Sequence, residues 1–103
     1  MVQITGMWGI NPQIGDNCKL AEDCRIIGDV LFGEGCEIGS KTTISGTNGK
    51  IIIENRVKIV HETKILCTLG YATVIEDDVE INSLVNIESS IIIRNSFIGE
   101  NLF

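Results

Sequence analysis

His61 is the only histidine of the chain, and Glu62 follows it directly. An imidazole beside a carboxylate can act as a general base, so His61 is the candidate catalytic residue. Cys67 could act as a nucleophile or a redox thiol, but the segment around it, Leu66 to Thr73, has no lysine or arginine to favour the thiolate. A solvent-exposed histidine in a turn is the simpler interpretation of His61, and the residue types alone leave both interpretations open.

A six-residue repeat determines where these side chains lie. Aliphatic or aromatic residues occupy every sixth position, and a small or β-branched residue follows each of the first five after four places. The two series are Ile14, Leu20, Ile26, Phe32, Ile38 and Ile44, and Cys18, Cys24, Val30, Cys36 and Thr42. A period of six fits neither an amphipathic helix, which repeats near 3.6, nor a continuous strand, which alternates every two. It predicts short strands joined by regular corners and stacked into a solenoid.

The spacing changes at several points along the chain. The repeat resumes at Ile53 after Ile44, with three extra residues within Ser45 to Ile52, and at Ile75 after Ile65, with four extra residues within Leu66 to Val74. If three hexapeptides form one coil, both insertions leave the same corner on successive coils, and loops on rigid scaffolds often carry function. We therefore expect a ligand-binding loop edge that includes Asn48, Glu62, Cys67 and Tyr71.

Counting back by six from Ile14 puts Trp8 and Val2 in register, and counting forward from Ile87 gives steps of five to Ile92 and six to Ile98.

The composition limits the class of protein. A chain of 103 residues predicts one domain over residues 1–103. The net charge of −6 argues against nucleic acid as a partner, and no apolar run exceeds three residues, so no membrane span is expected. Three of the four cysteines, Cys18, Cys24 and Cys36, occupy the small inward position of the repeat, which predicts reduced thiols and a cytoplasmic protein.

The repeat, an aliphatic residue often followed by glycine, alanine or an acidic residue, resembles that of the bacterial hexapeptide-repeat transferase family. The resemblance implies an all-β fold, a left-handed parallel β-helix with three hexapeptides per coil, which assembles as a homotrimer. We expect about five coils, with two loops stacked at one corner.

Two narrower resemblances concern the chemistry. The segment Asn48 to Asn55 and the segment Val74 to Ile81 resemble sugar O-acetyltransferases, whose catalytic histidine would lie in the loop Leu66 to Thr73, where this chain has none. The chain also resembles γ-class carbonic anhydrases, which share the looped middle coils. The three zinc-binding histidines of that family would fall on Leu66, Ser83 and Glu88. Because leucine cannot bind zinc, the sequence predicts no bound metal and a protein that is not a carbonic anhydrase.

These observations together predict a trimeric binding or assembly module derived from an acyltransferase-like scaffold, with a small-molecule ligand at the subunit interface. The alternative is a CoA-dependent O- or N-acetyltransferase that acts on a small hydroxyl or amine acceptor. In that case acetyl-CoA is the cofactor and His61 is the general base.

Overall fold

The computed structural model describes residues 3–7, 9–67, 72–82, 85–88, 91–92 and 97–98. Its regular elements are short strands, and all pairings between these strands are parallel. The strands are β1 (Gln3–Thr5), β2 (Lys19–Leu20), β3 (Arg25–Phe32), β4 (Glu37–Ile38), β5 (Thr43–Ile53), β6 (Lys58–Ile59), β7 (Lys64–Leu66), β8 (Thr73–Ile75), β9 (Glu80–Ile81), β10 (Asn86–Glu88), β11 (Ile91–Ile92) and β12 (Phe97–Ile98).

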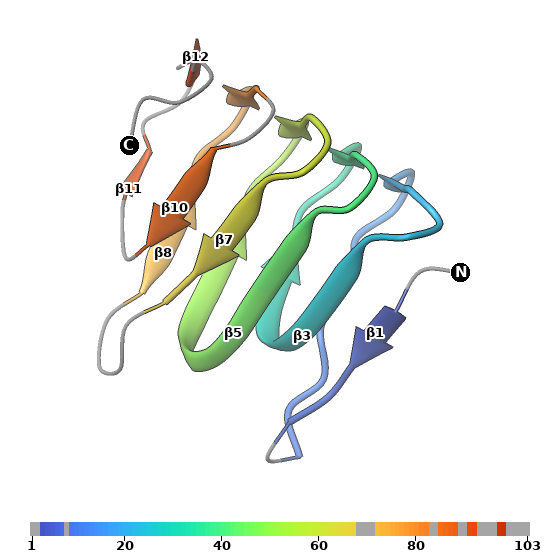
Figure 1. The fold of residues 1–103 in the computed structure, drawn as a ribbon, viewed down its shortest axis with the longest axis vertical. Coiled ribbons are helices and arrows are strands. Elements are labelled where there is room, and N and C mark those ends of the chain that lie inside the picture. The colour runs from blue at the N-terminus through green and yellow to red at the C-terminus, as the bar shows by residue number, and fades with distance from the viewer. Residues whose placement is uncertain are drawn as a thin grey trace.

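These strands wind into a left-handed parallel β-helix with three flat faces (Figure 1). Face 1 contains β1, β7, β10 and the first halves of β3 and β5. Face 2 contains the second halves of β3 and β5, followed by β8 and β11. Face 3 contains β2, β4, β6, β9 and β12. Five strands stack on face 1 and five on face 3, which makes about four turns and confirms the predicted fold class.

The repeat forms the core because inward positions of successive coils lie in register. Ile26 pairs with Ile44 and Ile44 with Ile65 on face 1, and the other two faces have equivalent columns. The described members of these columns from Ile26 to Ile87 are at most 3% exposed. The small residues of the repeat lie between these columns, and three of them are buried threonines. Their hydroxyls donate hydrogen bonds to main-chain oxygens: Thr42 to Val60 (3.4 Å), Thr63 to Asn82 (3.0 Å) and Thr73 to Leu66 (3.0 Å).

Residues with left-handed backbone conformation stack at the corner between faces 2 and 3. Asn17, Gly35, Arg56 and Asp78 follow one another at one-coil intervals, with φ of 62°, 69°, 57° and 60°. The Arg56 guanidinium donates to the Asp78 carboxylate from Nε (2.7 Å) and Nη2 (3.2 Å). This hydrogen-bonded partner lowers the pKa of Asp78. The corner therefore repeats one backbone shape on successive coils, which keeps the strands on both sides of it in register.

Both insertions lie at the corner between faces 1 and 2. On face 1, Ile26 pairs with Ile44, the partner that an unbroken repeat of three hexapeptides per coil gives. On face 2, Phe32 pairs with Ile53 and Ile53 pairs with Ile75, and both partners come later in the chain than an unbroken repeat would place them. The register therefore confirms two insertions stacked at one corner, and the ribbon turns there between the visible strands (Figure 1). Positions 68–71, which belong to the second insertion, are outside the described part of the chain.

The predicted register is wrong near the N-terminal end and right near the C-terminal end. Ile4, rather than Trp8, stands in register with Ile26. The extra residues fit into a turn, closed by main-chain hydrogen bonds from Met7 N to Ile10 O (2.9 Å) and from Ile10 N to Met7 O (3.0 Å). Trp8 and Val2 themselves are outside the described residues. At the other end, Ile75 pairs with Ile92 and Ile81 with Ile98, which confirms the predicted steps through Ile92 to Ile98.

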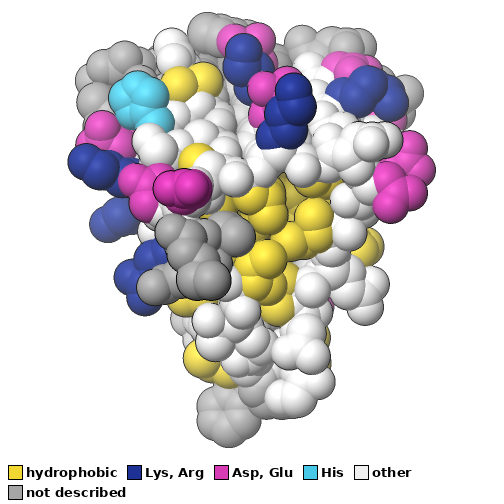
Figure 2. Space-filling view, turned by 90° about the vertical axis from the view of Figure 1, so that its right-hand side faces the viewer, with side chains coloured by type: hydrophobic (Ala, Val, Ile, Leu, Met, Phe, Trp, Pro, Cys, Tyr) yellow, Lys and Arg dark blue, Asp and Glu magenta, His cyan; other side chains and the backbone are white. Residues whose placement is uncertain are grey.

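The end of the solenoid near β1 exposes part of the core. Seen from that end, the outline is roughly triangular, with hydrophobic side chains gathered in the middle and charged ones along the upper rim (Figure 2). Ile14, Cys18 and Leu20 pack against the buried core but are only partly buried themselves. All four cysteines are free. The described residues include no helix long and apolar enough to cross a membrane. The cytoplasmic location and the single domain stay predictions.

Candidate functional site

His61 lies where it was expected, in a corner of the coil that the two insertions bracket. It follows the buried Ile59 by two residues, at the corner between faces 3 and 1, and its neighbour Glu62 has a left-handed φ of 58°. The His61 Nδ1 lies 3.3 Å from Glu62 Oε1, and the two side chains are 52% and 47% exposed. A carboxylate at this distance can orient an imidazole, which is the arrangement that a general base requires.

Of the predicted loop-edge residues, Glu62 lies beside His61, but the structure does not bring Asn48 or Cys67 near it. Asn48 and Cys67 belong to the corner between faces 1 and 2, so β7 and the width of face 1 separate them from His61. Asn48 is exposed. Cys67 is 4% exposed, and its Sγ lies 3.2 Å from both Lys50 O and Thr73 Oγ1. Its thiol therefore packs inside the coil, and Tyr71 is outside the described residues.

The other buried thiols are suited to packing as well. The Cys36 Sγ donates to Glu54 O (2.9 Å). Burial raises the pKa of Cys36 to about 11, and burial also raises the pKa of Cys24. Both thiols are consequently protonated near neutral pH, whereas the effective nucleophile is the thiolate. Cys24 and Cys36 are core residues rather than candidate nucleophiles.

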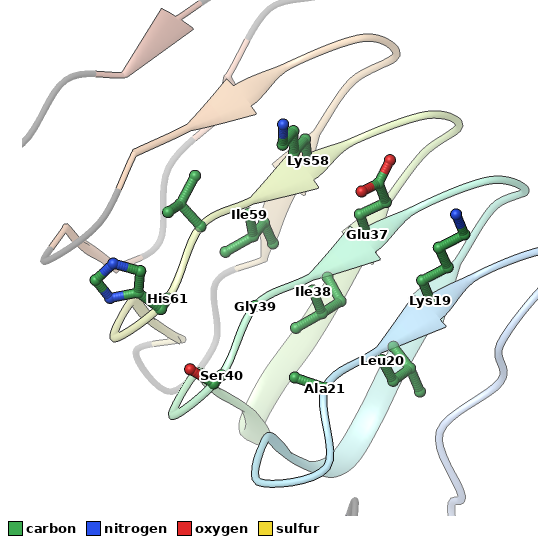
Figure 3. A pocket seen from close by; sticks show the side chains of 11 residues that line it. Lys19, Leu20, Ala21, Glu37, Ile38, Gly39, Ser40, Lys58, Ile59 and His61 are labelled. Atoms are coloured by element: carbon green, nitrogen blue, oxygen red, sulfur yellow. The ribbon is translucent and has the colours of Figure 1, made fainter.

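A depression of about 470 Å³ lies on face 3, and His61 is at one edge of it. In the close view, Lys19, Glu37 and Lys58 project from successive strands, and Ser40 and His61 lie at the adjoining corner (Figure 3). Gly39 lies between them, and a Cβ at this position would come within 2.7 Å of the His61 main-chain nitrogen. The glycine thus allows successive turns of the chain to approach closely beneath the depression.

Sequence reasoning missed this depression, although a signal for it is present. In β2, β4, β6 and β9 a lysine or glutamate stands immediately before the inward aliphatic residue. The sequence alone does not show that these four charged residues are stacked on successive coils, because that requires the length of each coil. The alignment of these lysine and glutamate side chains along the depression therefore follows from the coil lengths together with the repeat.

The three positions predicted from the zinc site of γ-class carbonic anhydrases are only partly described. Leu66 is 38% exposed on face 1, and Glu88 pairs with it on the next coil. Ser83 is outside the described residues. Among the residues that the structure describes, no three histidine, cysteine, aspartate or glutamate side chains gather where they could hold a metal ion.

Comparisons with known proteins agree with the fold. No family model matches the chain. The crystal structure of a Bacillus cereus protein of proposed acetyltransferase activity superposes with a TM-score of 0.67 over 97% of this chain and 76% of that one, at 18% identity. The chain has a hexapeptide repeat and shares the fold of this neighbour. A hexapeptide transferase family protein from Anaplasma phagocytophilum gives a TM-score of 0.49 at 17% identity, over 95% of this hexapeptide-repeat protein and 75% of the other chain.

Two curated relatives are named as carbonic anhydrases. One, from Geobacillus kaustophilus (strain HTA426), is 33% identical over 91 residues, which are 88% of this chain and 50% of that protein. The other, named probable carbonic anhydrase, from Methanocaldococcus jannaschii, is 33% identical over 88 residues, 85% of this chain and 55% of that protein. This hexapeptide-repeat protein therefore spans about half the length of the curated relatives that it matches.

These relatives show that the predicted exclusion of carbonic anhydrases was wrong. The exclusion rested on three positions, Leu66, Ser83 and Glu88, whereas the similarity extends over most of the chain. A zinc site needs only a few outward side chains, while the inward columns and corners determine the fold. A leucine at one ligand position therefore could not decide the relationship.

Proposed function

We propose that this hexapeptide-repeat protein is a homotrimeric binding or assembly module. The observation that carries the proposal is an apolar column on the outside of face 2. Leu31 is 37% exposed, and Ile52 and Val74, which follow it in register on the next two coils, are half-buried. Contiguous apolar side chains on a surface mark contact sites between proteins, because burying them removes apolar area from water.

The corresponding positions of face 1 are polar. The column includes Arg25, Thr43, Lys64 and Asn86, all in register. Of these two matching columns, the one on face 2 would therefore gain more from burial. Three copies whose helix axes run parallel could each turn this column toward a common axis. A small-molecule ligand would then bind between subunits.

The trimer is tested by a charge placed on face 2. The Ile52→Lys substitution should convert a three-chain species to single chains, because an unpaired lysine would have to be desolvated in the interface. Thr43→Lys is the matched control, since Thr43 lies on the same strand β5 but faces outward on face 1. Static light scattering at micromolar concentrations measures the mass. A wild-type protein that stays monomeric over this range contradicts the trimer.

A second candidate function is CoA-dependent acetyl transfer. It is favoured by the 3.3 Å contact between His61 and Glu62 at the edge of a depression that Ser40 and Lys58 also line. In this reaction His61 would remove the proton from an acceptor hydroxyl or amine as that group attacks the acetyl carbonyl of acetyl-CoA. The thiol of CoA would leave.

The test is acetyl transfer by wild type and by His61→Gln. Loss of a positioned base lowers a rate by about 10² to 10⁴-fold. We expect that loss with no change in oligomer mass, because His61 is half exposed and outside the core. Equal turnover by both proteins would exclude His61 as the base.

Because two relatives are named as carbonic anhydrases, CO₂ hydration is a further reaction to assay with this chain. A zinc ion at the position of that family's site would lack a donor at Leu66, and the described residues do not fit a three-ligand site elsewhere. Metal analysis of the purified protein, and CO₂ hydration measured with and without added zinc, test whether the activity of the relatives extends to this chain.

A further inference from the structure

Face 3 carries a ladder of alternating charges. Lys19 pairs with Glu37, Glu37 with Lys58 and Lys58 with Glu80, each on the next coil of the solenoid. All four side chains are exposed. The close view shows the first three projecting to the same side from successive strands (Figure 3). We call these four residues the charge ladder.

The charges of the ladder are not neutralised by one another. Within the part of the chain that the structure describes, none of the four takes part in an ion pair of 4.0 Å or less. Arg56 and Asp78, which also lie one coil apart, show that neighbouring coils can form such a pair, at 2.7 Å. The ladder charges therefore remain available to a partner.

We propose that face 3 docks against face 3 of a second copy of the chain, related by a two-fold axis that lies between the two faces and runs parallel to their strands. The order lysine, glutamate, lysine, glutamate read backwards gives the opposite charge at every level. Lys19 then faces Glu80 of the second copy and Glu37 faces Lys58 of the second copy, and the two-fold repeats both pairs. A two-fold contact of this kind uses the same patch on both copies, so the patch must complement itself.

Two other arrangements of the two faces bring like charges together. If the second copy slips by one coil, Glu37 meets Glu37 and Lys19 meets Lys58. If the two chains run parallel, every residue meets its own copy. Like charges held opposite each other favour separation, so among two-fold contacts the charges are best matched when the two chains run antiparallel and unshifted.

The size of the contact predicts a weak association. Stacked coils are about 4.8 Å apart, so a ladder over four coils is about 14 Å long. Such a contact covers much less than the roughly 800 Å² per partner that stable interfaces bury. The association should therefore depend strongly on salt, because exposed charges provide most of the attraction. The small residues Ala21 and Gly39 beside the ladder leave room for the side chains of the second copy.

The experiment is sedimentation velocity of ladder variants at low and high salt. It is done in the Ile52→Lys background, so that the result does not depend on the trimer contact of face 2. We expect dimers at about 20 mM salt that dissociate at about 500 mM salt. Glu37→Lys alone, or Lys58→Glu alone, makes two of the four pairs repulsive and should weaken the dimer about tenfold. Lys64→Glu on face 1 is the matched control and should leave the dimer unchanged.

The double variant Glu37→Lys with Lys58→Glu decides between contact within one chain and contact between chains. Across the two-fold axis it restores opposite charges in all four pairs, so the dimer should return to wild-type strength. Within one chain the double variant places like charges on adjacent coils. If the ladder acted only within a chain, the double variant would therefore be no more stable than the single variants. A background protein that stays monomeric at low salt, or a double variant no better than the singles, overturns the proposal.

Discussion

Replacing three consecutive isoleucines of β5 by alanine, one at a time, tests the alternation on which the fold depends. Ile51 and Ile53 are 0% exposed, whereas Ile52 lies between them on the outside of face 2 and is half-buried. Alanine removes three carbons, worth about 2.4 kcal/mol at roughly 0.8 kcal/mol each, and a buried site adds a cavity term. We expect the free energy of unfolding to fall by about 2–5 kcal/mol for Ile51→Ala and for Ile53→Ala.

For Ile52→Ala in a single chain, we expect the free energy of unfolding to fall by about 1 kcal/mol, because the side chain is partly in water and its removal opens no internal cavity. Urea denaturation at several protein concentrations measures all three. If face 2 is buried between subunits, the cost of Ile52→Ala should grow with protein concentration, since association stabilises the folded state. A loss for Ile52→Ala as large as that for Ile53→Ala in monomeric protein would refute the alternation.

Two more predictions concern Cys36 and the corner between faces 3 and 1. Because the pKa of Cys36 is raised from 9.0 to about 11 in the folded state, the unfolded state loses its proton first. Stability should be unaffected below pH 9 and should fall between pH 9 and 11 by at most about 1.4 kcal/mol per pH unit, a slope that Cys36→Ala should lack in urea titrations. Lys41 has a φ of 57°, so Lys41→Gly should raise the free energy of unfolding by up to about 1 kcal/mol. Lys64→Gly, within β7, should lower the free energy of unfolding. If thermal melts show that both glycine variants lose stability equally, Lys41 is not strained.

The sequence predicted the solenoid because its core is built from one local rule repeated many times. Ile26, Ile44 and Ile65 needed only the period of six and the count of extra residues to be placed one above another. The position of His61 followed in the same way, two places after the inward Ile59. Features that depend on one residue every six positions can be read from the sequence without knowledge of the distant contacts.

The failures have equally local causes. The turn at Met7 to Ile10 contains Gly9, with φ of 78°, and so breaks the count that put Trp8 in register. Cys67 was assigned to a loop, although it stands two places after the inward Ile65 and alternation puts it on the same side. The charge ladder could not be predicted, because residues that are adjacent across coils of different lengths have no fixed spacing in the sequence.

The variation in coil length lies at one corner, and this explains why face 3 can carry an ordered ladder. The coils differ in length, because residues that pair on successive coils are unequally spaced in the sequence. The pairs are Ile4–Ile26, Ile26–Ile44, Ile44–Ile65, Ile53–Ile75 and Ile75–Ile92. Inward positions on either side of face 3 nevertheless keep their spacing of six throughout. Every added or missing residue therefore falls between faces 1 and 2, where a longer loop costs little entropy. An insertion at either corner of face 3 would instead displace one rung of the ladder. The corner between faces 1 and 2 is free to vary, and face 3 keeps the fixed geometry that a charge-matched contact requires.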